Sequence, residues 1–382
     1  MPAPGIASAA TTLLSEHRLR MVLRADGHGF TQVEPLPRRA SQAHRLLIGR
    51  TAQQAVALLP TLFPLGAMAH RSAASAALAS LRGDERADAQ DPRPVLLERL
   101  REHLLPLHRD WPLNMGLAPS NATLQGIEYL QRALDSPRAQ VQAAVRALVE
   151  QHTLGMPASE FLAIDNADDL LGWARGHPHL MPAHFLSWLA TQPLSLRPVQ
   201  LPPPLQTPSP RALARQLLGD TGDAFEAYPQ WQGICRETGP WARRCEHALL
   251  RDLSRSEADP SNALLARFCA RLLDLAQTLL EWLDVAAAVD VTRAADGAGL
   301  VHTARGLLAY GVALDHSERI TRCVILTPAQ WTFHPQGTAP ELLRSIAWTT
   351  PRQVAHTASL VVCAVDPFVR CDFAIPAAQD DN

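Results

Sequence analysis

Cysteine is scarce in this chain and is confined to its last two-fifths. Six cysteines occur among 382 residues, and none forms the closely spaced C-x-x-C pair that is typical of zinc sites. The chain is also too long to be a small scaffold that disulfides stabilise. We therefore expect reduced thiols, which favours a cytoplasmic protein. The six are Cys235, Cys245, Cys269, Cys323, Cys363 and Cys371.

Aromatic residues are scarce too, at 5% of the chain, and neither sign of charge prevails. The 35 basic and 37 acidic residues leave a formal net charge of −2. Nucleic-acid binding needs a clustered basic face, and single strands are bound by stacked aromatic side chains. These two absences exclude nucleic acid from the predicted partners.

Long hydrophobic runs are also missing. The longest candidate, residues 263–289, is too often interrupted by charge to cross a membrane. Residues 1–15 have no basic segment ahead of an apolar stretch, so we expect no signal peptide. The prediction is a soluble protein with no membrane partner. The charged residues in the run are Arg267, Arg271, Asp274, Glu281 and Asp284.

What the chain does have is hydrophobic content, at 47%, and enough length to bury a large core. We expect three parts. Residues 1–40 form an N-terminal lobe in which 19–23 and 30–33 pair as a β-hairpin around Asp26-Gly27. Residues 41–290 form a helical bundle, and residues 291–382 form a C-terminal lobe.

Helical periodicity dominates the middle part. Thr51 is a candidate N-cap, as is Ser136 ahead of a proline. Residues 263–285 carry the widest apolar stripe, and Cys269 within it is expected to be packed rather than to be a ligand. The proline-rich stretch 193–210 is expected to be an extended loop between helical halves.

Strand patterns appear in the C-terminal lobe. Residues 300–303, 307–314 and 320–326 are expected as strands, with a turn at 315–318 between the last two. Helices are expected near 339–347 and 351–362, ahead of an extended tail. The predicted fold class is therefore α+β: mainly a helical bundle, with small β elements at both ends.

Four segments of the C-terminal third resemble a known pattern. Residues 302–309 are similar to a Pro-Arg-Gly strand, 320–324 to the hairpin that follows it, and 327–335 to a Pro-Thr-x-Trp-Asn segment. Residues 365–371, Val-Asp-Pro-Phe-Val-Arg-Cys, resemble an Asp-Pro-Cys-x-x-Cys signature. All four of these patterns are found in the large subunit of [NiFe] hydrogenases.

The N-terminal half agrees with this resemblance. Residues 47–55 and 62–70 are similar to a Gly-Arg segment leading into Arg-x-Cys-Gly-x-Cys-x-x-x-His, and 237–243 to Glu-x-Gly-Pro-Leu-Ala-Arg. Residues 16–20 are a weaker match to the opening Glu-Gly-His-Leu-Arg. The short length and the Trp-Thr-Phe-His-Pro-x-Gly form of 331–337 resemble the HupK/HoxV-type maturation proteins of these hydrogenases.

This resemblance implies a smaller version of the large-subunit fold, without a resident cofactor. Members of the branch are regarded as scaffolds for an Fe(CN)2CO unit, which here would be bound only transiently. The implied partners are the apo large subunit of a hydrogenase, a HypC-like chaperone and other maturation proteins.

Most of the metal-binding thiolates are missing. A [NiFe] centre needs four, because sulfur holds the nickel and bridges it to iron. Phe63 and Gly66 replace the first pair, Phe368 replaces the third, and only Cys371 is kept. One thiolate cannot build a dinuclear centre, so hydrogenase activity is excluded and we expect no enzyme.

Arg305 and Asp366 are the best-matched polar residues of the implied pocket. The resemblance implies that Arg305 reaches the pocket, where a guanidinium can donate hydrogen bonds to a cyanide nitrogen. The alternative is a strand-end arginine that bridges to a carboxylate. Asp366 either orients that arginine or fixes the turn before Pro367.

Three further residues are candidates by the same resemblance. Cys371 is an iron ligand or an inert cysteine on a terminal strand. His70 is a ligand or proton donor, or else a satisfied core histidine. Glu16 matches a proton-relay glutamate whose role would be vestigial here.

Three functions remain open. The first is a non-catalytic scaffold that assembles or transfers Fe(CN)2CO. The second is a chaperone or interaction module that binds only protein and has no metal site. The third, a residual metalloenzyme using His70, Cys371 and carboxylates, requires an unusual ligand set. The wide spacing of Cys235, Cys245 and His247 favours a chance grouping over a metal site.

Overall fold

The computed structural model describes most of the chain between residues 18 and 374. Of the terminal strands 18–32 and 370–374 only the backbone is described. Glu16, Phe368 and the predicted cap Ser136 lie outside the described residues. The described ranges are 18–22, 24–25, 30–32, 44–83, 91–133, 138–255, 261–285, 291–366 and 370–374.

An antiparallel sheet forms the C-terminal lobe. Its four strands are β4 (Thr292–Ala295), β5 (Ala298–Thr303), β6 (Gly306–Leu314) and β7 (Ile320–Leu326), in the order β4-β5-β6-β7. The predicted hairpin of the last two strands is confirmed, with Ala309 opposite Leu326. Strand β4 was not among the strands predicted from the sequence.

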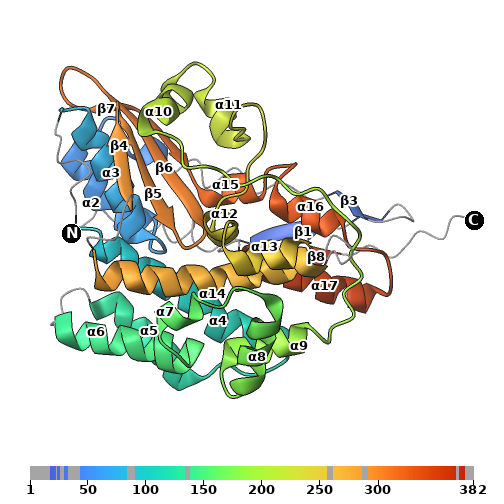
Figure 1. The fold of residues 1–382 in the computed structure, drawn as a ribbon. Helices are drawn as coiled ribbons and strands as arrows, with labels where there is room; N and C mark the ends of the chain where they lie inside the picture. The colour runs from blue at the N-terminus through green and yellow to red at the C-terminus, as the bar shows by residue number, and fades with distance from the viewer. Residues whose placement is uncertain are drawn as a thin grey trace, which may run out of the picture.

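Helices cover both faces of this sheet (Figure 1). One face packs against α3 (Ala67–Ser80), beside which lies α2 (Ala52–Leu62). The other face packs against α10 (Pro210–Leu218), and α11 (Gly222–Ala227) contacts β7. Because strand residues alternate between faces, Tyr310 points toward α3 while its neighbour Gly311 approaches Leu217 of α10.

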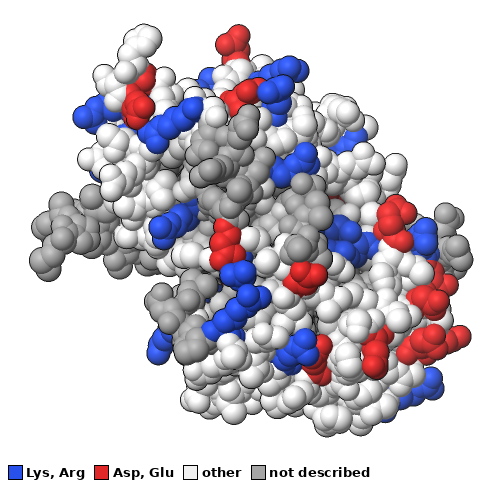
Figure 2. All heavy atoms as spheres, turned by 60° about the vertical axis from the view of Figure 1, so that its left-hand side comes forward, with Lys and Arg blue, Asp and Glu red and all other residues white. Residues whose placement is uncertain are grey.

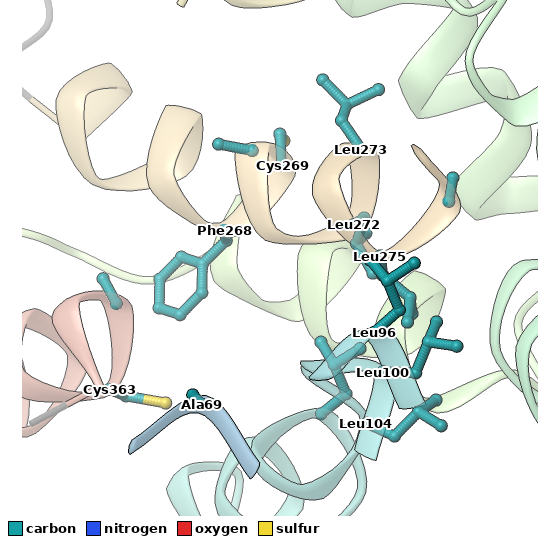
Figure 3. Close-up of a cluster of buried hydrophobic side chains, with 14 of the residues drawn as sticks. Ala69, Leu96, Leu100, Leu104, Phe268, Cys269, Leu272, Leu273, Leu275 and Cys363 are labelled. Carbon is teal, nitrogen blue, oxygen red and sulfur yellow. The ribbon is translucent and has the colours of Figure 1, made fainter. Parts of the chain in front are cut away.

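The bundle is built around α14 (Ser261–Leu283), which packs against α4 (Arg93–Asn114). The predicted apolar stripe of α14 is confirmed, since Cys269 and its neighbours Phe268 and Leu272 are fully buried (Figure 3). Around this pair lie α5 (Asn121–Arg132), α6 (Arg138–Arg146), the π-helix η4 (Ala147–Leu154), α7 (Ala158–Phe161), α8 (Ala167–Gly176), α9 (Met181–Leu189), α12 (Pro240–Arg244) and α13 (Ala248–Arg255).

The predicted cap and the proline-rich loop are also confirmed. The side chain of Thr51 accepts a hydrogen bond from Gln54 N and so begins α2. Between α9 and α10 the chain has no helix, and its isolated bridges join Leu196 to Ile346 and Pro204 to Glu237. Three helices follow the sheet: α15 (Pro328–Thr332), α16 (Thr338–Arg344) and α17 (Pro351–Val365).

The N-terminal hairpin was predicted with the wrong partner strand. β1 (Arg18–Val22) pairs in parallel with β8 (Arg370–Ala374), so that Leu19 lies opposite Cys371. The antiparallel hairpin is the shorter pair β2 (Arg24–Ala25) and β3 (Phe30–Gln32). A turn signal detects only local pairing, whereas β1 finds its partner almost a whole chain length away. The three-part division by residue number stays a prediction.

The α+β fold class is confirmed by these elements: many helices, one small sheet and short strand pairs near both ends. On the face shown in Figure 2, basic and acidic side chains lie among one another without a broad patch of one sign. None of the helices in the described ranges is both long enough and apolar enough to span a membrane.

Candidate functional site

The turn between β5 and β6 carries Arg305. The hydroxyl of Thr303 accepts hydrogen bonds from the backbone N–H groups of Arg305 and Gly306, at 3.2 and 3.3 Å. Gly306 has a φ of 144°, and a Cβ built there would lie 2.2 Å from Thr238 Oγ1. Only glycine fits, so the turn is held tightly against residues 238–239 and the direction of Arg305 is fixed.

Two carboxylates hold the guanidinium of Arg305. Its Nη1 lies 3.0 Å from Glu102 Oε2, and its Nε lies 3.2 Å from Asp366 Oδ2. Glu102 comes from α4 and Asp366 from the end of α17, so the ion pairs join the sheet to the bundle and to the C-terminal helix. Asp366 contacts Arg305, as one of the two alternatives for this residue requires, whereas the turn at Pro367 lies outside the described residues.

Asp366 ends α17 in a left-handed conformation. Its φ is 44°, and its backbone N–H donates to Val362 O at 2.9 Å. Arg271 of α14 donates from Nη1 to Asp366 Oδ2 at 3.0 Å. Burial raises the pKa of a carboxyl, but here Arg305 and Arg271 outweigh it and hold the pKa of Asp366 below its usual range.

Glu102 differs from Asp366 in its proton affinity. Burial raises the pKa of Glu102, Arg305 lowers it, and the charge of Asp366 raises it further, so that the pKa lies above its ordinary value. Its second oxygen, Oε1, is buried, and the backbone N–H of Gly66 also lowers the pKa of this carboxyl by hydrogen bonding. A Cβ built on Gly66 would lie 3.9 Å from this oxygen, which places Glu102 beside the start of α3.

Gly66 begins α3 and has a φ of 75°. It offers no capping side chain, and Glu98 of α4 takes that role by accepting from Met68 N at 2.9 Å and Ala69 N at 2.8 Å. Burial, and then the nearby Glu102, raise the pKa of Glu98 to about 7. The segment aligned with the first thiolate motif is thus fixed by an acidic pair one helical turn apart.

His70 lies on the sheet side of this position. Its Nδ1 is 2.7 Å from the hydroxyl of Tyr310, and the ring of Phe63 stacks on it at 3.9 Å between centroids. Burial lowers the pKa of His70 to about 3, so the ring is neutral at physiological pH. These contacts are those of a satisfied core histidine, one of the two alternatives for this residue.

The structure therefore brings Arg305 and Asp366 into direct contact and places His70 nearby, next to Gly66. Cys371 lies on β8, where only its backbone course is described, and Glu16 lies outside the described residues. The roles of all five in binding an iron unit stay predictions. Cavity space beside Arg305 is about 20 Å³, roughly the room that one water molecule needs.

Sequence reasoning missed Glu102, Glu98 and Arg271. The signal for the first two was an i, i+4 pair of glutamates on a helix that is otherwise rich in buried leucines such as Leu100. For Arg271 the signal was a charge inside the widest apolar stripe. Buried charges require partners, so these residues pointed to a polar cluster.

Cys363 is a further residue that the motifs did not single out. It lies on α17 one turn before Asp366 and belongs to the same buried cluster as Ala69 of α3 (Figure 3). Burial raises the pKa of its thiol well above the ordinary value, so the thiol stays protonated.

The loose group of Cys235, Cys245 and His247 does not form a metal site. Cys245 donates to Ala242 O at 3.5 Å, and His247 Nε2 lies 3.0 Å from Leu162 O. Within the described ranges, no three His, Cys, Asp or Glu residues are placed to hold a metal ion.

Comparison with known sequences gives relatives that match along most of the chain, although no family model matches it. The hydrogenase expression/formation protein HoxV of Cupriavidus necator is 29% identical over 361 residues, which cover 87% of this chain and 90% of that protein. The hydrogenase expression/formation protein HupK of Bradyrhizobium diazoefficiens is 29% identical over 367 residues, covering 90% and 92%. HupK of Azotobacter vinelandii is also 29% identical, over 349 residues.

Solved structures give weaker likenesses. An NAD+-reducing [NiFe]-hydrogenase in its H2-reduced state superposes with a TM-score of 0.47 at 14% identity, covering 89% of this chain and 92% of that one. A Ni-Fe-Se hydrogenase from D. vulgaris Hildenborough gives a TM-score of 0.47 at 15% identity, covering 85% and 90%. By its sequence, the chain is similar to the HoxV and HupK hydrogenase expression/formation proteins over about nine tenths of its length, as its motifs predicted.

Proposed function

We propose that this chain is a non-catalytic accessory protein of [NiFe]-hydrogenase maturation. The observation that carries the proposal is its similarity to proteins named for hydrogenase expression and formation, which extends over about nine tenths of both chains. The missing thiolates support a non-catalytic role, because Phe63 and Gly66 offer no sulfur where a dinuclear centre needs two.

The finer proposal is that the protein accepts an Fe(CN)2CO unit as cargo and passes it to the apo large subunit. Arg305 supports it, since a guanidinium held in one direction by two carboxylates is suited to donate to a cyanide nitrogen. Cys371, five residues after Asp366, would supply the thiolate for iron. Partners in this scheme are a HypC-like chaperone as donor and the apo large subunit as acceptor.

Loading such a cargo requires the site to open. An iron with three diatomic ligands is far larger than the water-sized space of about 20 Å³ beside Arg305. The ring of Phe63 is the side chain whose movement would make room next to Gly66, because it stacks on His70 and is only half-buried. We therefore expect Phe63→Ala to load iron at least as readily as the parent chain.

The second candidate is a chaperone that binds hydrogenase or maturation proteins without any metal. The closed space at Arg305 and the stacking of Phe63 on His70 favour it, because both fill the position where a cofactor would sit. In this case the ion pairs of Arg305 serve only to hold the lobes together.

Anaerobic co-expression with the maturation proteins separates the two candidates. The purified chain is assayed for iron and for cyanide and carbonyl infrared bands, and hydrogenase activity is measured in the same cells. The carrier predicts bands in the parent chain, loss of bands and of maturation in Cys371→Ser, and retention of both in the control Cys245→Ser, whose thiol lies elsewhere.

Bands that persist in Cys371→Ser contradict the ligand assignment. Absence of bands together with full maturation in Cys371→Ser favours the protein-binding chaperone. Undiminished hydrogenase maturation in cells that lack the chain altogether overturns the maturation role itself.

A further inference from the structure

A second cavity is lined in part by Thr238 and Gly239, against which the turn that carries Arg305 also packs. Its volume is about 340 Å³, within the range of small-molecule sites and room for roughly ten water molecules. It is lined by α4, α12 and α14, by the strands around the β5–β6 turn, and by the extended segment 205–207. The segments 237–243 and 302–309 both contribute lining residues, among them Arg243 and His302.

Three arginines converge on this cavity: Arg99, Arg243 and Arg244. All three bond to the fully buried carboxylate of Asp274, with Arg99 Nη2 at 3.0 Å, Arg243 Nη2 at 2.5 Å and Arg244 Nε at 3.0 Å. Glu281 is the acidic residue of the described lining, and it lies 3.5 Å from Arg99 Nη1. Among the described residues, three guanidinium groups thus face Glu281 and the buried Asp274 behind them, so the described wall carries more positive than negative charge.

Several polar atoms around the cavity have no partner. Arg99 Nε and Arg243 Nη1 are buried without a hydrogen bond in the described part of the chain. The same holds for Thr238 Oγ1 and His302 Nδ1, which belong to lining residues as well. These four atoms are enclosed by the described part of the chain, and a buried donor left unpaired costs about 1–3 kcal/mol, so the wall of the cavity keeps unused hydrogen-bonding capacity beside the arginines.

The potential inside the cavity is positive. Burial, and then the charges of Arg243 and Arg99, lower the pKa of His302 to about 3. His302 therefore stays neutral, and its Nε2 lies 3.0 Å from the Thr207 hydroxyl at the exposed rim. Neutral donors at the rim and arginines within are the arrangement that receives an anion with several oxygen acceptors.

We propose that this cavity binds a small molecule bearing a phosphoryl group, with Arg99, Arg243 and Arg244 around its oxygens. Arginine forks match tetrahedral oxyanions in geometry as well as in charge. The volume exceeds what an inorganic phosphate fills, so an organic phosphomonoester fits better. The proposal is independent of the iron cargo, although Thr238 lines both cavities.

Calorimetric titration of the full chain at low ionic strength tests the proposal. The probes are inorganic phosphate and glycerol 3-phosphate. We expect saturable binding at one site, tighter for glycerol 3-phosphate if the ligand is an organic ester and equal if the phosphoryl group alone is recognised. Arg244→Gln should weaken binding at least about tenfold, because it removes a charge-assisted contact.

Three further variants keep the test independent of folding defects. Gln206 lines the cavity at an exposed position, so Gln206→Glu adds a negative charge with little risk to the fold and should weaken binding roughly threefold to tenfold. Its neutral counterpart Gln206→Met should not. Arg211→Gln, which removes an exposed arginine outside the cavity, is the matched control for Arg244→Gln.

A cavity filled only by water gives no saturable binding of either probe, which overturns the proposal. Binding that Arg244→Gln and Gln206→Glu leave unchanged overturns it too. Binding that falls equally in Arg211→Gln reflects nonspecific attraction to surface charge and has the same consequence.

Discussion

Arg305 and Asp366 lie in contact across 61 residues of chain, with Nε of the arginine 3.2 Å from Oδ2 of the aspartate. Each residue sits where the backbone bends sharply: Arg305 before Gly306, and Asp366 at the left-handed end of α17. The ion pair therefore links two rigid turns rather than two mobile side chains.

Removing the charge of Asp366 should destabilise the fold. Asp366→Asn leaves Arg271 and Arg305 facing a neutral side chain in a buried site, and breaking a buried pair in this way costs about 3–5 kcal/mol. Chemical denaturation at neutral pH measures the change. The exposed pair of Arg211 and Asp296 is the comparison, because Asp296→Asn should cost less than about 1 kcal/mol. Equal losses of unfolding free energy in both variants would contradict a buried, stabilising role for the ion pairs of Asp366.

Substitution of Asp274 should destabilise the fold still more, because its one carboxylate bonds to Arg99, Arg243, Arg244 and His103. Its pKa lies well below the usual value because Arg243 and Arg99 outweigh the effect of burial. We expect Asp274→Asn to yield little folded protein at 37 °C, as judged by solubility and circular dichroism. Normal yield and melting temperature would show that water replaces the carboxylate at little cost.

Acid should weaken the fold through buried histidines. Burial, with a smaller effect of His152, lowers the pKa of His108 to about 4 from 6.5. The unfolded chain takes up a proton below pH 6.5 that the folded chain refuses, so stability falls as the pH drops from 6.5 to 4. His108→Gln can keep the bond to Thr153 and does not titrate.

The variant should reduce the difference in unfolding free energy between pH 7 and pH 5 by about 2 kcal/mol. Urea denaturation at the two pH values measures it. If the unfolding free energy changed equally between pH 7 and pH 5 in both proteins, His108 would be protonated in the folded state.

Glu226 should change the stability of the fold in the opposite direction, with a loss as the pH rises. Burial, and then Asp223, raise its pKa to about 7, and its Oε1 has no partner among the described residues. The protonated form is favoured by the fold, so its contribution is present below pH 4.5 and is lost as the pH rises to 7. Glu226→Gln should gain about 2 kcal/mol over the parent at pH 8 and nothing at pH 4.

Thermal melts across this range test the prediction. Glu246→Gln, at an exposed position, should leave the pH profile unchanged. A gain for Glu226→Gln that is the same at both pH values would point to packing rather than to ionisation.

Periodicity in the sequence predicted much of the fold. The apolar stripe of α14, the burial of Cys269 and the β6–β7 hairpin were all foreseen, because each depends on residues within one or two turns or strands. The pairing of β1 with β8 was missed, because nothing local distinguishes it from the hairpin that Asp26-Gly27 suggests.

The candidate site was foreseen only in part. Arg305 and Asp366 came from motif resemblance, and their contact is present. Glu102 completes the cluster from a helix whose sequence gives no sign of which charge it meets 203 residues away. Asp274 was noticed only as an interruption of an apolar run, although it collects three arginines. Pattern reveals that a buried charge needs a partner, whereas only the fold decides which partner it has.

The pairing of β1 with β8 also has a consequence for the order of synthesis. During synthesis the backbone of Arg18–Val22 is made long before the strand that contains Cys371. Until then one edge of β1 is open to any extended segment that can add to it. A partner bound to that edge would exclude β8 and hold Cys371 away from its place beside Leu19, so release of the partner would set the moment at which the cysteine joins the fold.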